Sequence, residues 1–434
     1  MTVVQAALIL FLIFFGLMFI GVPISVSIGC SSIVVLLLSG FETDVLAHVV
    51  AQRCFKGIDS FALLALPFFM LAGSIMNKGG IARRLVRLAR FFVGKIPGYL
   101  AATNVLTNMF FGAISGSSVA AASAVGKIMG PLEKEEGYED AFSAAVNICS
   151  APTGVIIPPS GPLILYSITA GSVSVSALFM AGYIPGVLLG LCVMAVAIFL
   201  AKKKGYTGST VKETDSLGRV LIDAVPSIFM MIIVMGGILL GWFTATEAGI
   251  VACLYCMVLG FAYKELDGKQ LWKLMSECMM DTAVILFLIA ASNIMSYAMS
   301  ISEIPAALSS MLMGITDNKY ILLLIMNVFL LVLGMFLDLT PAVLIFTPIF
   351  LPIATGFGMS PVHFGVMLIL NLAIGSVTPP VGSVLFVGCN VGGVTVEQVT
   401  KYIVPIFISM VAALLLVVYI PALSLFIPQL CGLV

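Results

Sequence analysis

Charged residues are scarce in this chain. They make up 9% of the 434 positions, and the 20 basic residues are balanced by 20 acidic ones. An average soluble protein is about 25% charged and about 45–50% apolar, whereas this chain is 61% hydrophobic with a mean hydropathy of +1.20. The shortage of charge excludes soluble enzymes, disordered tails and secreted disulfide scaffolds, and the balance of signs gives no indication of a nucleic-acid partner. We therefore expect an integral membrane protein with many spans.

Several catalytic signatures are also missing. The two histidines, His48 and His363, have no carboxylate-rich neighbourhood in the sequence, which disfavours a proton relay. The dipeptide Gly126-Lys127 lacks the earlier glycine of a P-loop, and there is no HExxH motif or zinc cluster. The CxxC at 253–256 lies in an apolar stretch without a second pair. An intramembrane hydrolase would need an Asp dyad or a Ser/His pair, and neither is visible, so we do not expect an enzyme.

The apolar residues form runs of about 20, the length that crosses a bilayer as a helix. The first run has no basic leader or small-residue cleavage site, so we expect a span there rather than a cleaved signal. A polar linker at 202–220 divides the chain near its middle. Ten full crossings are predicted near 4–21, 22–40, 60–77, 140–170, 176–201, 221–241, 246–263, 278–300, 362–391 and 402–428.

The two halves of the chain resemble each other when the first is shifted by 221 positions. A double proline with flanking glycines then coincides without a gap, which chance does not readily explain. The matching pairs are Tyr99 with Tyr320, Pro131 with Pro352, Gly137 with Gly358, Gly154 with Gly375, Pro158-Pro159 with Pro379-Pro380, Gly161 with Gly382 and Gly171 with Gly392.

The basic residues predict the orientation. If both termini lie outside, 17 of the 20 lysines and arginines fall in cytoplasmic segments, and only Arg53, Lys56 and Lys319 remain outside. Each half then contains five crossings, an odd number, so the second half enters the membrane from the opposite side. The repeat is therefore inverted, as in many alternating-access carriers.

Two further apolar segments, 98–131 and 319–353, are expected to be re-entrant helical hairpins. The first is rich in Gly and Ser at its predicted tip, Ser115 to Ser118, and the charge distribution places both of its ends in the cytoplasm. The second has its predicted tip at Asp338 to Pro341 and enters from outside. Non-helical backbone at this depth requires surrounding protein or a water-filled cavity. A full span with a small-residue packing face is the alternative, chiefly for the first segment.

The spans at 140–170 and 362–391 are predicted to break at their double prolines, which remove backbone donors and clash with the preceding turn. Thr340 and Thr378 each precede a proline, an N-cap pattern, and Ser117, Ser118 and Ser160 are further candidate caps. Up to four helix N-termini would then meet near the middle of the bilayer. Helix N-termini favour anions, whereas free carbonyls, hydroxyls and a carboxylate suit Na⁺.

These patterns give two sets of candidate site residues. The Asp338 carboxylate is expected to support Na⁺ rather than to touch an anionic substrate, which it would repel. The candidate Na⁺ residues are Ser115, Gly116, Ser117, Ser150, Thr153, Gly154, Gly334, Asp338, Thr340, Gly375, Thr378 and Gly382. The candidate substrate residues are Ser118, Pro158, Pro159, Ser160, Pro341, Pro379 and Pro380.

The same stretches resemble the large membrane subunit of tripartite ATP-independent periplasmic (TRAP) transporters, of the DctM or SiaM type. The similarity covers nearly the whole chain and is most specific in its last block. The sequence departs from the family pattern at Ala245 and at Gly161-Pro162. The blocks that carry it are GAISGSSVAAASAVG (112–126), GVIIPPSGPLILY (154–166), AGYIPG (181–186), FTATEAG (243–249) and 334–382.

The resemblance implies an all-α elevator-type importer with two inverted repeats, driven by co-transported Na⁺ and carrying an organic anion such as sialic acid or a dicarboxylate. It implies a scaffold at 1–97 and 221–317. Within the first of these ranges, Arg83, Arg87 and Arg90 fall on one face of the segment 81–93, and this pattern predicts an interfacial amphipathic helix. The moving transport domain would comprise 98–204 and 318–434, with a cytoplasmic linker at 205–220. Implied partners are a small four-helix membrane subunit (DctQ or SiaQ type) and a periplasmic binding protein, in a bacterial inner membrane. A single-component sodium/dicarboxylate symporter, which needs no binding protein, is the alternative.

Overall fold

The computed structural model describes residues 1–434 except 79, 95, 172, 207–216, 316–317 and 380. Every regular element in the described part is helical, as the composition predicts. In chain order the helices are α1 (Val3–Phe19), α2 (Ile24–Leu38), α3 (Thr43–Ile58), η1 (Phe61–Leu64), α4 (Ala65–Lys78), α5 (Ile81–Val93), α6 (Tyr99–Ser115), α7 (Ser118–Glu135), α8 (Asp140–Ile156), α9 (Gly161–Ala170), α10 (Val175–Lys203), α11 (Leu217–Leu239), α12 (Ala245–Ala262), α13 (Gly268–Ile301), α14 (Ile304–Ile315), α15 (Lys319–Gly334), α16 (Leu339–Gly356), α17 (Pro361–Gly375), α18 (Ser383–Gly392), α19 (Val396–Tyr419) and α20 (Ala422–Leu430).

The helix boundaries confirm the internal repeat. Subtracting 221 from the bounds of α16 (339 and 356) gives 118 and 135, the bounds of α7. The same subtraction takes the first residues of α12, α17 and α19 to those of α2, α8 and α10. The turns after α7 and α16 both use a left-handed glycine, Gly137 (φ 79°) and Gly358 (φ 74°). A turn of this kind needs glycine because a Cβ atom disfavours positive φ.

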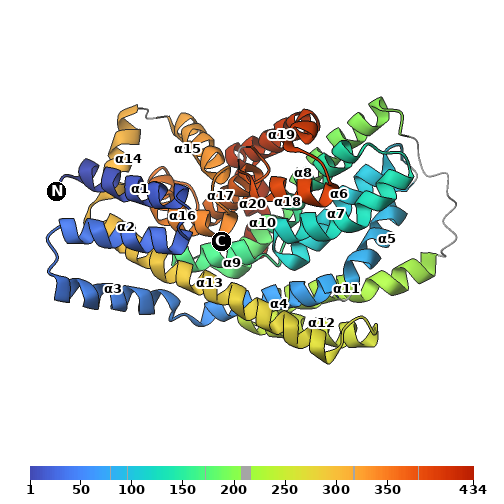
Figure 1. Ribbon diagram of the computed structural model, residues 1–434, viewed down its shortest axis with the longest axis horizontal. Coiled ribbons are helices and arrows are strands. Elements are labelled where there is room, and N and C mark those ends of the chain that lie inside the picture. Colours follow the sequence, from blue (N-terminus) through green and yellow to red (C-terminus); the bar gives the residue numbers. More distant parts are fainter. Residues whose placement is uncertain (79, 95, 172, 207–216, 316–317, 380) are drawn as a thin grey trace.

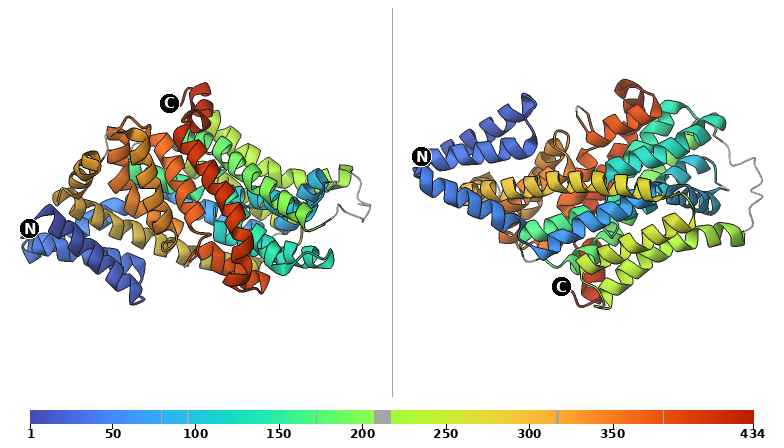
Figure 2. Two further views of the ribbon diagram at one scale, coloured as in Figure 1. Left: turned by 90° about the horizontal axis from the view of Figure 1, so that it is seen from above. Right: turned by 60° about the horizontal axis from the view of Figure 1, so that its bottom comes forward.

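The two hairpins enter the molecule from opposite ends. Figure 1 shows α6 and α7 on the right and α15 and α16 on the left, with their connecting tips turned toward the centre. The arms of each hairpin pack against each other, so the segment at 98–131 is a hairpin rather than a single full span. In Figure 2 the long helix α13 lies along α3 and α4, which it contacts.

Six described helices are long and apolar enough to cross a membrane, and the pair α8–α9, bent by 50°, makes a seventh. One of the six is the hairpin arm α16, so six of the ten predicted crossings meet this criterion. The other four, near 4–21, 22–40, 221–241 and 362–391, are shorter apolar helices.

Two helix boundaries and one additional helix differ from the sequence prediction. α13 begins at Gly268, ten residues before the predicted crossing, because Asp267 and Gln270 form a capping box there. The crossing predicted at 402–428 is two helices, and the break falls at Pro421, which has no N–H to continue α19. α3 was not predicted, since its mixed polar and apolar residues resemble a loop.

The predicted interfacial helix is α5. Its apolar side is buried at Leu85 and Leu88, while Arg84 lies 3.6 Å from a Glu265 carboxylate oxygen and 3.6 Å from the centre of the Tyr263 ring. The helix therefore has one apolar and one basic face, as its sequence predicts.

Candidate functional site

The first hairpin turns where the sequence places its tip. α6 ends at Ser115, and Gly116 takes a left-handed conformation with φ 64°. Ser117 is the N-cap of α7, and its hydroxyl accepts the Ala120 N–H at 3.2 Å. The predicted serine cap is confirmed, and it orients the N-terminus of α7 toward the tip.

The second hairpin turns slightly earlier than predicted, between Met335 and Asp338. Asp338 occupies the N-cap position of α16, so the prediction that Thr340 is the N-cap is wrong. Pro341 lies in the first helical turn, where its missing N–H costs nothing, and the helix can therefore begin before it. The Asp338 carboxylate does not cap its own helix. It accepts a hydrogen bond from the Ser383 hydroxyl at 2.9 Å, which joins this tip to the start of α18.

Both predicted broken helices are present. Between α8 and α9, Ser160 is the N-cap and accepts the Leu163 N–H at 3.4 Å, as predicted. Between α17 and α18 the break is longer, and the N-cap is Gly382.

Thr378 is therefore not an N-cap, contrary to prediction. Residues 376–379 and 381–382 are non-helical, and the buried Thr378 hydroxyl instead donates to the Gly375 carbonyl at 2.5 Å. The Gly382 N–H donates to the Met335 carbonyl at 2.9 Å, which is a second link between the break and the second tip.

The two tips and the two breaks surround one cavity of about 170 Å³, the tip cavity. The N-terminal turns of α7, α9, α16 and α18 all contribute to its lining, so four helix N-termini converge there, as predicted. Their partial positive charges add at this point. Asp338 is the only charged residue among the described residues that line it. Seven candidate residues line the cavity: Ser115, Gly116, Ser117, Ser118, Pro159, Asp338 and Thr340.

The other candidates lie around this cavity rather than in its lining. Gly154 packs on Gly112, and Gly375 packs on Gly334, so these glycines hold each broken helix close to a hairpin arm. Ser150 and Thr153 are fully buried in α8. Their place in an ion site stays a prediction, as does that of Thr378 and Gly382, and the place of Pro158, Ser160, Pro341 and Pro379 in a substrate site also stays a prediction. Pro380 lies outside the described residues.

One wall of the tip cavity was not predicted from the sequence. This wall belongs to the predicted scaffold and consists of Leu66, Phe69 and Met70, from α4, and Ile285, from α13. These are apolar residues inside apolar runs, so no motif distinguishes them. Gly161 and Pro162, where the sequence departs from the family pattern, also line the cavity, although neither was predicted as a site residue.

The chemistry of this lining differs from that of a transition-metal site. The described residues include no group of three His, Cys, Asp or Glu side chains that could hold a metal ion. The tip cavity offers instead hydroxyl groups, backbone groups at helix ends and one carboxylate, which are oxygen ligands suited to a hard cation. The same helix N-termini suit an anion.

Comparison with known proteins identifies the family. The family model for the DctM component of tripartite ATP-independent periplasmic transporters matches residues 11–423. The chain belongs to this family. It is 45% identical to the uncharacterized protein YgiK of Salmonella typhimurium over 98% of this chain and 97% of that protein. It is 38% identical to the isethionate TRAP transporter permease protein DctMQ of Oleidesulfovibrio alaskensis, over 94% of this chain and 64% of that protein.

The sialic acid TRAP transporter large permease protein SiaM of Vibrio cholerae is 34% identical, over 96% of both chains. The crystal structure of the Alcanivorax borkumensis YdaH transporter has a similar fold, with a TM-score of 0.67 and 14% identity, covering 87% of this chain and 89% of that one. The chain is thus a large permease subunit of the TRAP type, and its family and apolar helices indicate the inner membrane. Permeases of this family work with a small membrane subunit and a periplasmic binding protein.

Proposed function

We propose that this permease imports an organic anion together with Na⁺ through the tip cavity. The convergence of four helix N-termini from both repeats on one small cavity carries the proposal. Helix N-termini stabilise an anionic group that approaches them. The substrates named for relatives, isethionate and sialic acid, are organic anions of this kind.

Asp338 supports Na⁺ as the coupled ion. A carboxylate in contact with an anionic substrate would repel it, whereas a carboxylate beside Na⁺ compensates for the ion's lost hydration. The hydrogen bond between Asp338 and Ser383 joins the second tip to α18, so a cation bound there would also hold the tip against α18. Thr340 lines the same cavity, and its hydroxyl together with nearby backbone carbonyls would complete the oxygen shell.

The tip cavity has one polar wall and one apolar wall, and this contrast favours an elevator motion as the transport step. The predicted transport domain presents polar tips to the cavity, while the predicted scaffold presents Leu66, Phe69, Met70 and Ile285. Apolar side chains make no directional bonds, so the tips could move past this wall without breaking hydrogen bonds to it. A small four-helix subunit would extend the scaffold, and a periplasmic binding protein would deliver the anion to the face that carries both termini.

Reconstitution in proteoliposomes tests the proposal. Uptake should require an inward Na⁺ gradient and increase with an inside-negative potential, since each net charge gains about 2.3 kcal/mol per 100 mV. Equal uptake with K⁺ or choline would contradict Na⁺ coupling. Adding the small subunit and the binding protein separates the two mechanisms, because a single-component symporter would transport without them.

A further inference from the structure

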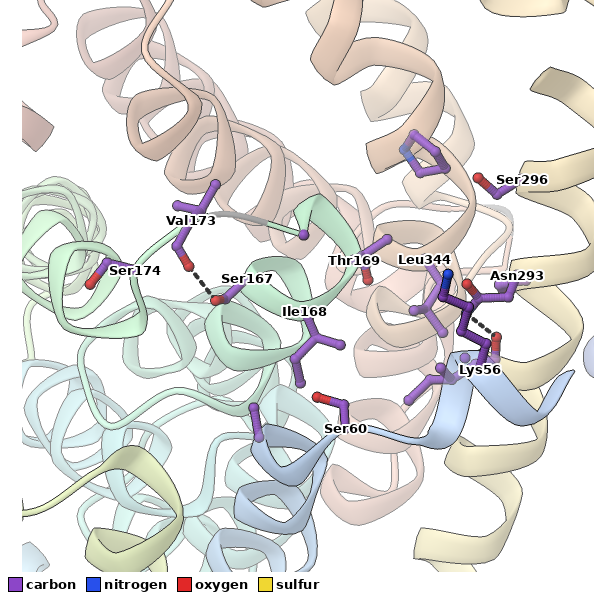
Figure 3. A pocket seen from close by; sticks show the side chains of 16 residues that line it. Lys56, Ser60, Ser167, Ile168, Thr169, Val173, Ser174, Asn293, Ser296 and Leu344 are labelled. Carbon is purple, nitrogen blue, oxygen red and sulfur yellow. Dashed lines mark hydrogen bonds between the residues drawn. The ribbon is translucent and has the colours of Figure 1, made fainter. Parts of the chain in front are cut away.

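A second and larger cavity lies between the predicted scaffold and the predicted transport domain. Its volume is about 490 Å³, and we call it the vestibule. Figure 3 shows Lys56, Asn293 and Ser296 along one side and Ser167 and Thr169 toward the other. A cavity of this size falls within the range of about 300–1,000 Å³ that small-molecule sites occupy, whereas the tip cavity falls below it.

The vestibule continues the tip cavity along the same helices. On α13 the tip cavity is lined by Ile285, and the vestibule by Ile289 and Ser292 on the same face. On α16 the step is from Thr340 to Leu344. A step of four residues is about one helical turn, or about 6 Å. The two cavities are therefore neighbours along the interface between the predicted domains. The vestibule lies on the predicted periplasmic side of the tip cavity, because Lys56, which lines it, is predicted to be periplasmic.

The lining of the vestibule suits a hydroxylated anion. Within the part of the lining that the structure describes, Lys56 is the one charged residue, and the other polar side chains are hydroxyls and the amide of Asn293. Asn293 donates to the Ile289 carbonyl at 3.0 Å, which leaves its side-chain oxygen for a ligand. Ser292 is 5% exposed, and its hydroxyl has no hydrogen-bond partner among the described residues. A buried hydroxyl without a partner is costly, so a ligand that bonded to it would gain free energy.

The position of Lys56 is fixed by close packing of α3 on α13. A Cβ atom at the neighbouring Gly57 would lie 2.5 Å from the Asn293 amide nitrogen, so a larger residue there would displace the Asn293 side chain. One turn earlier, the Arg53 guanidinium stacks on the Tyr297 ring at 4.1 Å. These two contacts hold the end of α3 against α13 and leave Lys56 as the cation of the vestibule.

We propose that the vestibule is a first binding site for the organic anion, occupied before the tip cavity. The substrate carboxylate or sulfonate pairs with Lys56, and its hydroxyl groups bond to Ser292 and Asn293. This inference rests on the proposed function, because it takes an organic anion as the substrate. It adds a site that selects for negative charge in advance of the sodium-dependent step.

Charged thiol reagents test the vestibule without transport. In a Ser296→Cys variant, the anionic sulfonatoethyl methanethiosulfonate should react faster than the cationic trimethylammonium-ethyl reagent. Adding Lys56→Glu should lower the ratio of the two rates by about tenfold, because the charge at this site changes by two units. The parent chain without Ser296→Cys gives the background from native cysteines, of which Cys30 and Cys431 are exposed. A ratio unchanged by Lys56→Glu would overturn the proposal.

Transport by Lys56 variants supplies the second test. Lys56→Gln should raise the substrate concentration for half-maximal uptake about tenfold at saturating Na⁺, and Lys56→Arg should restore it. Lys319→Gln is the matched control, since it removes a cation predicted on the same side of the membrane but outside both cavities. If wild-type uptake depends on Na⁺ and Lys56→Gln behaves as wild type, the vestibule site is wrong and the proposed function stands. If wild-type uptake ignores Na⁺, the coupling proposal fails, and the reagent ratio still decides the vestibule.

Discussion

The two repeats share a backbone arrangement but differ in how their hairpins are held. In the first, Asn108 donates to the Asn147 side-chain oxygen at 3.0 Å and to the Ser150 hydroxyl at 2.8 Å, and Asn104 donates to Glu133 at 3.1 Å. In the second, the corresponding core is nearly apolar. The similar backbone of the two repeats thus comes from glycines, prolines and turns at matching positions, while the buried polar side chains differ between the repeats.

That second core has one buried amide pair. Asn371 donates to the Asn327 side-chain oxygen at 2.8 Å and to its backbone carbonyl at 2.9 Å. Asn371 and Ser150 occupy matching positions in the 221-residue repeat. The same position therefore hydrogen-bonds to the hairpin in both halves, through an amide in the second and a hydroxyl in the first.

The tips show the same divergence in charge. The first tip has Ser117 as its cap, and the second has Asp338 at the same step of the turn, with its carboxylate bonded to Ser383. Buried or membrane-depth charge is costly unless it has a partner or a function. Only the second tip carries a carboxylate, so the two repeats contribute different charge to the tip cavity. We assign the ion site to this second tip.

The largest expected effect comes from the glycine contacts. A Cβ atom at Gly154 would lie 2.5 Å from the Gly112 Cα and the Asn108 carbonyl oxygen, and one at Gly375 would lie 2.7 Å from the Gly334 Cα. These are backbone atoms, which cannot rotate away. Gly154→Ala should therefore lower the unfolding free energy by about 3 kcal/mol, and Gly375→Ala by somewhat less. Thermal unfolding in detergent measures both.

Gly130→Ala is the matched control for this pair. Gly130 lies inside α7, and a Cβ atom there would meet nothing within 4 Å. Alanine should be neutral or stabilise by about 0.5–1 kcal/mol, because it favours helix over the unfolded chain. Equal stability of all three variants would show that the glycine contacts are looser than the structure describes.

The polar networks give the next effect. Asn108→Leu removes donors from partners on α8 and leaves buried oxygen atoms unsatisfied, which should cost about 2–3 kcal/mol. Asn371→Leu affects a single partner, Asn327, and should cost about 1 kcal/mol. The same unfolding assay compares the two. A larger loss for Asn371→Leu would reverse the assignment of the first hairpin as the more polar half.

A smaller and more specific effect is expected at the tips. Asp338→Asn keeps the side-chain shape and removes the charge, so it should raise the Na⁺ concentration for half-maximal transport about tenfold, equivalent to about 1.4 kcal/mol. Apparent substrate affinity at saturating Na⁺ should change less. Ser383→Ala removes only the hydrogen bond to Asp338 and serves as the control. If Asn alters stability but not the Na⁺ dependence, Asp338 is a structural link, and the ion site belongs nearer Gly375 and Thr378.

The sequence predicted the repeat, the hairpins and the breaks because glycine and proline act locally. A double proline breaks a helix wherever it occurs, and Ser117 and Ser160 cap the helices that follow them. Prediction from the sequence failed where a helix start or a cavity wall depends on contacts between residues far apart in the chain. Thr378 has the local pattern of a cap, yet a contact between Gly382 and Met335 fixes a later helix start. The apolar scaffold wall carries no sequence signal, because its role arises only when the tips lie against it.

The smallest expected effect is at the matching N-cap positions Glu139 and Ser360, which precede α8 and α17. Hydrogen bonds from Lys204 and Tyr402 lower the pKa of Glu139 to about 2, and Lys401 adds a contact at 3.1 Å. A pKa lowered by folding stabilises the protein above the unfolded value of about 4.5, and this contribution disappears as the pH falls toward 2. The side chain is 40% exposed, so solvent screening limits the gain to under about 1 kcal/mol.

Glu139→Gln should therefore lower the unfolding temperature slightly at pH 7, with the difference from wild type shrinking between pH 5 and pH 3. Ser360→Ala should do nothing at either pH, since the Ser360 side chain makes no capping hydrogen bond. A Glu139→Gln defect that persists unchanged at pH 3 would mean that the side chain acts by packing rather than by charge.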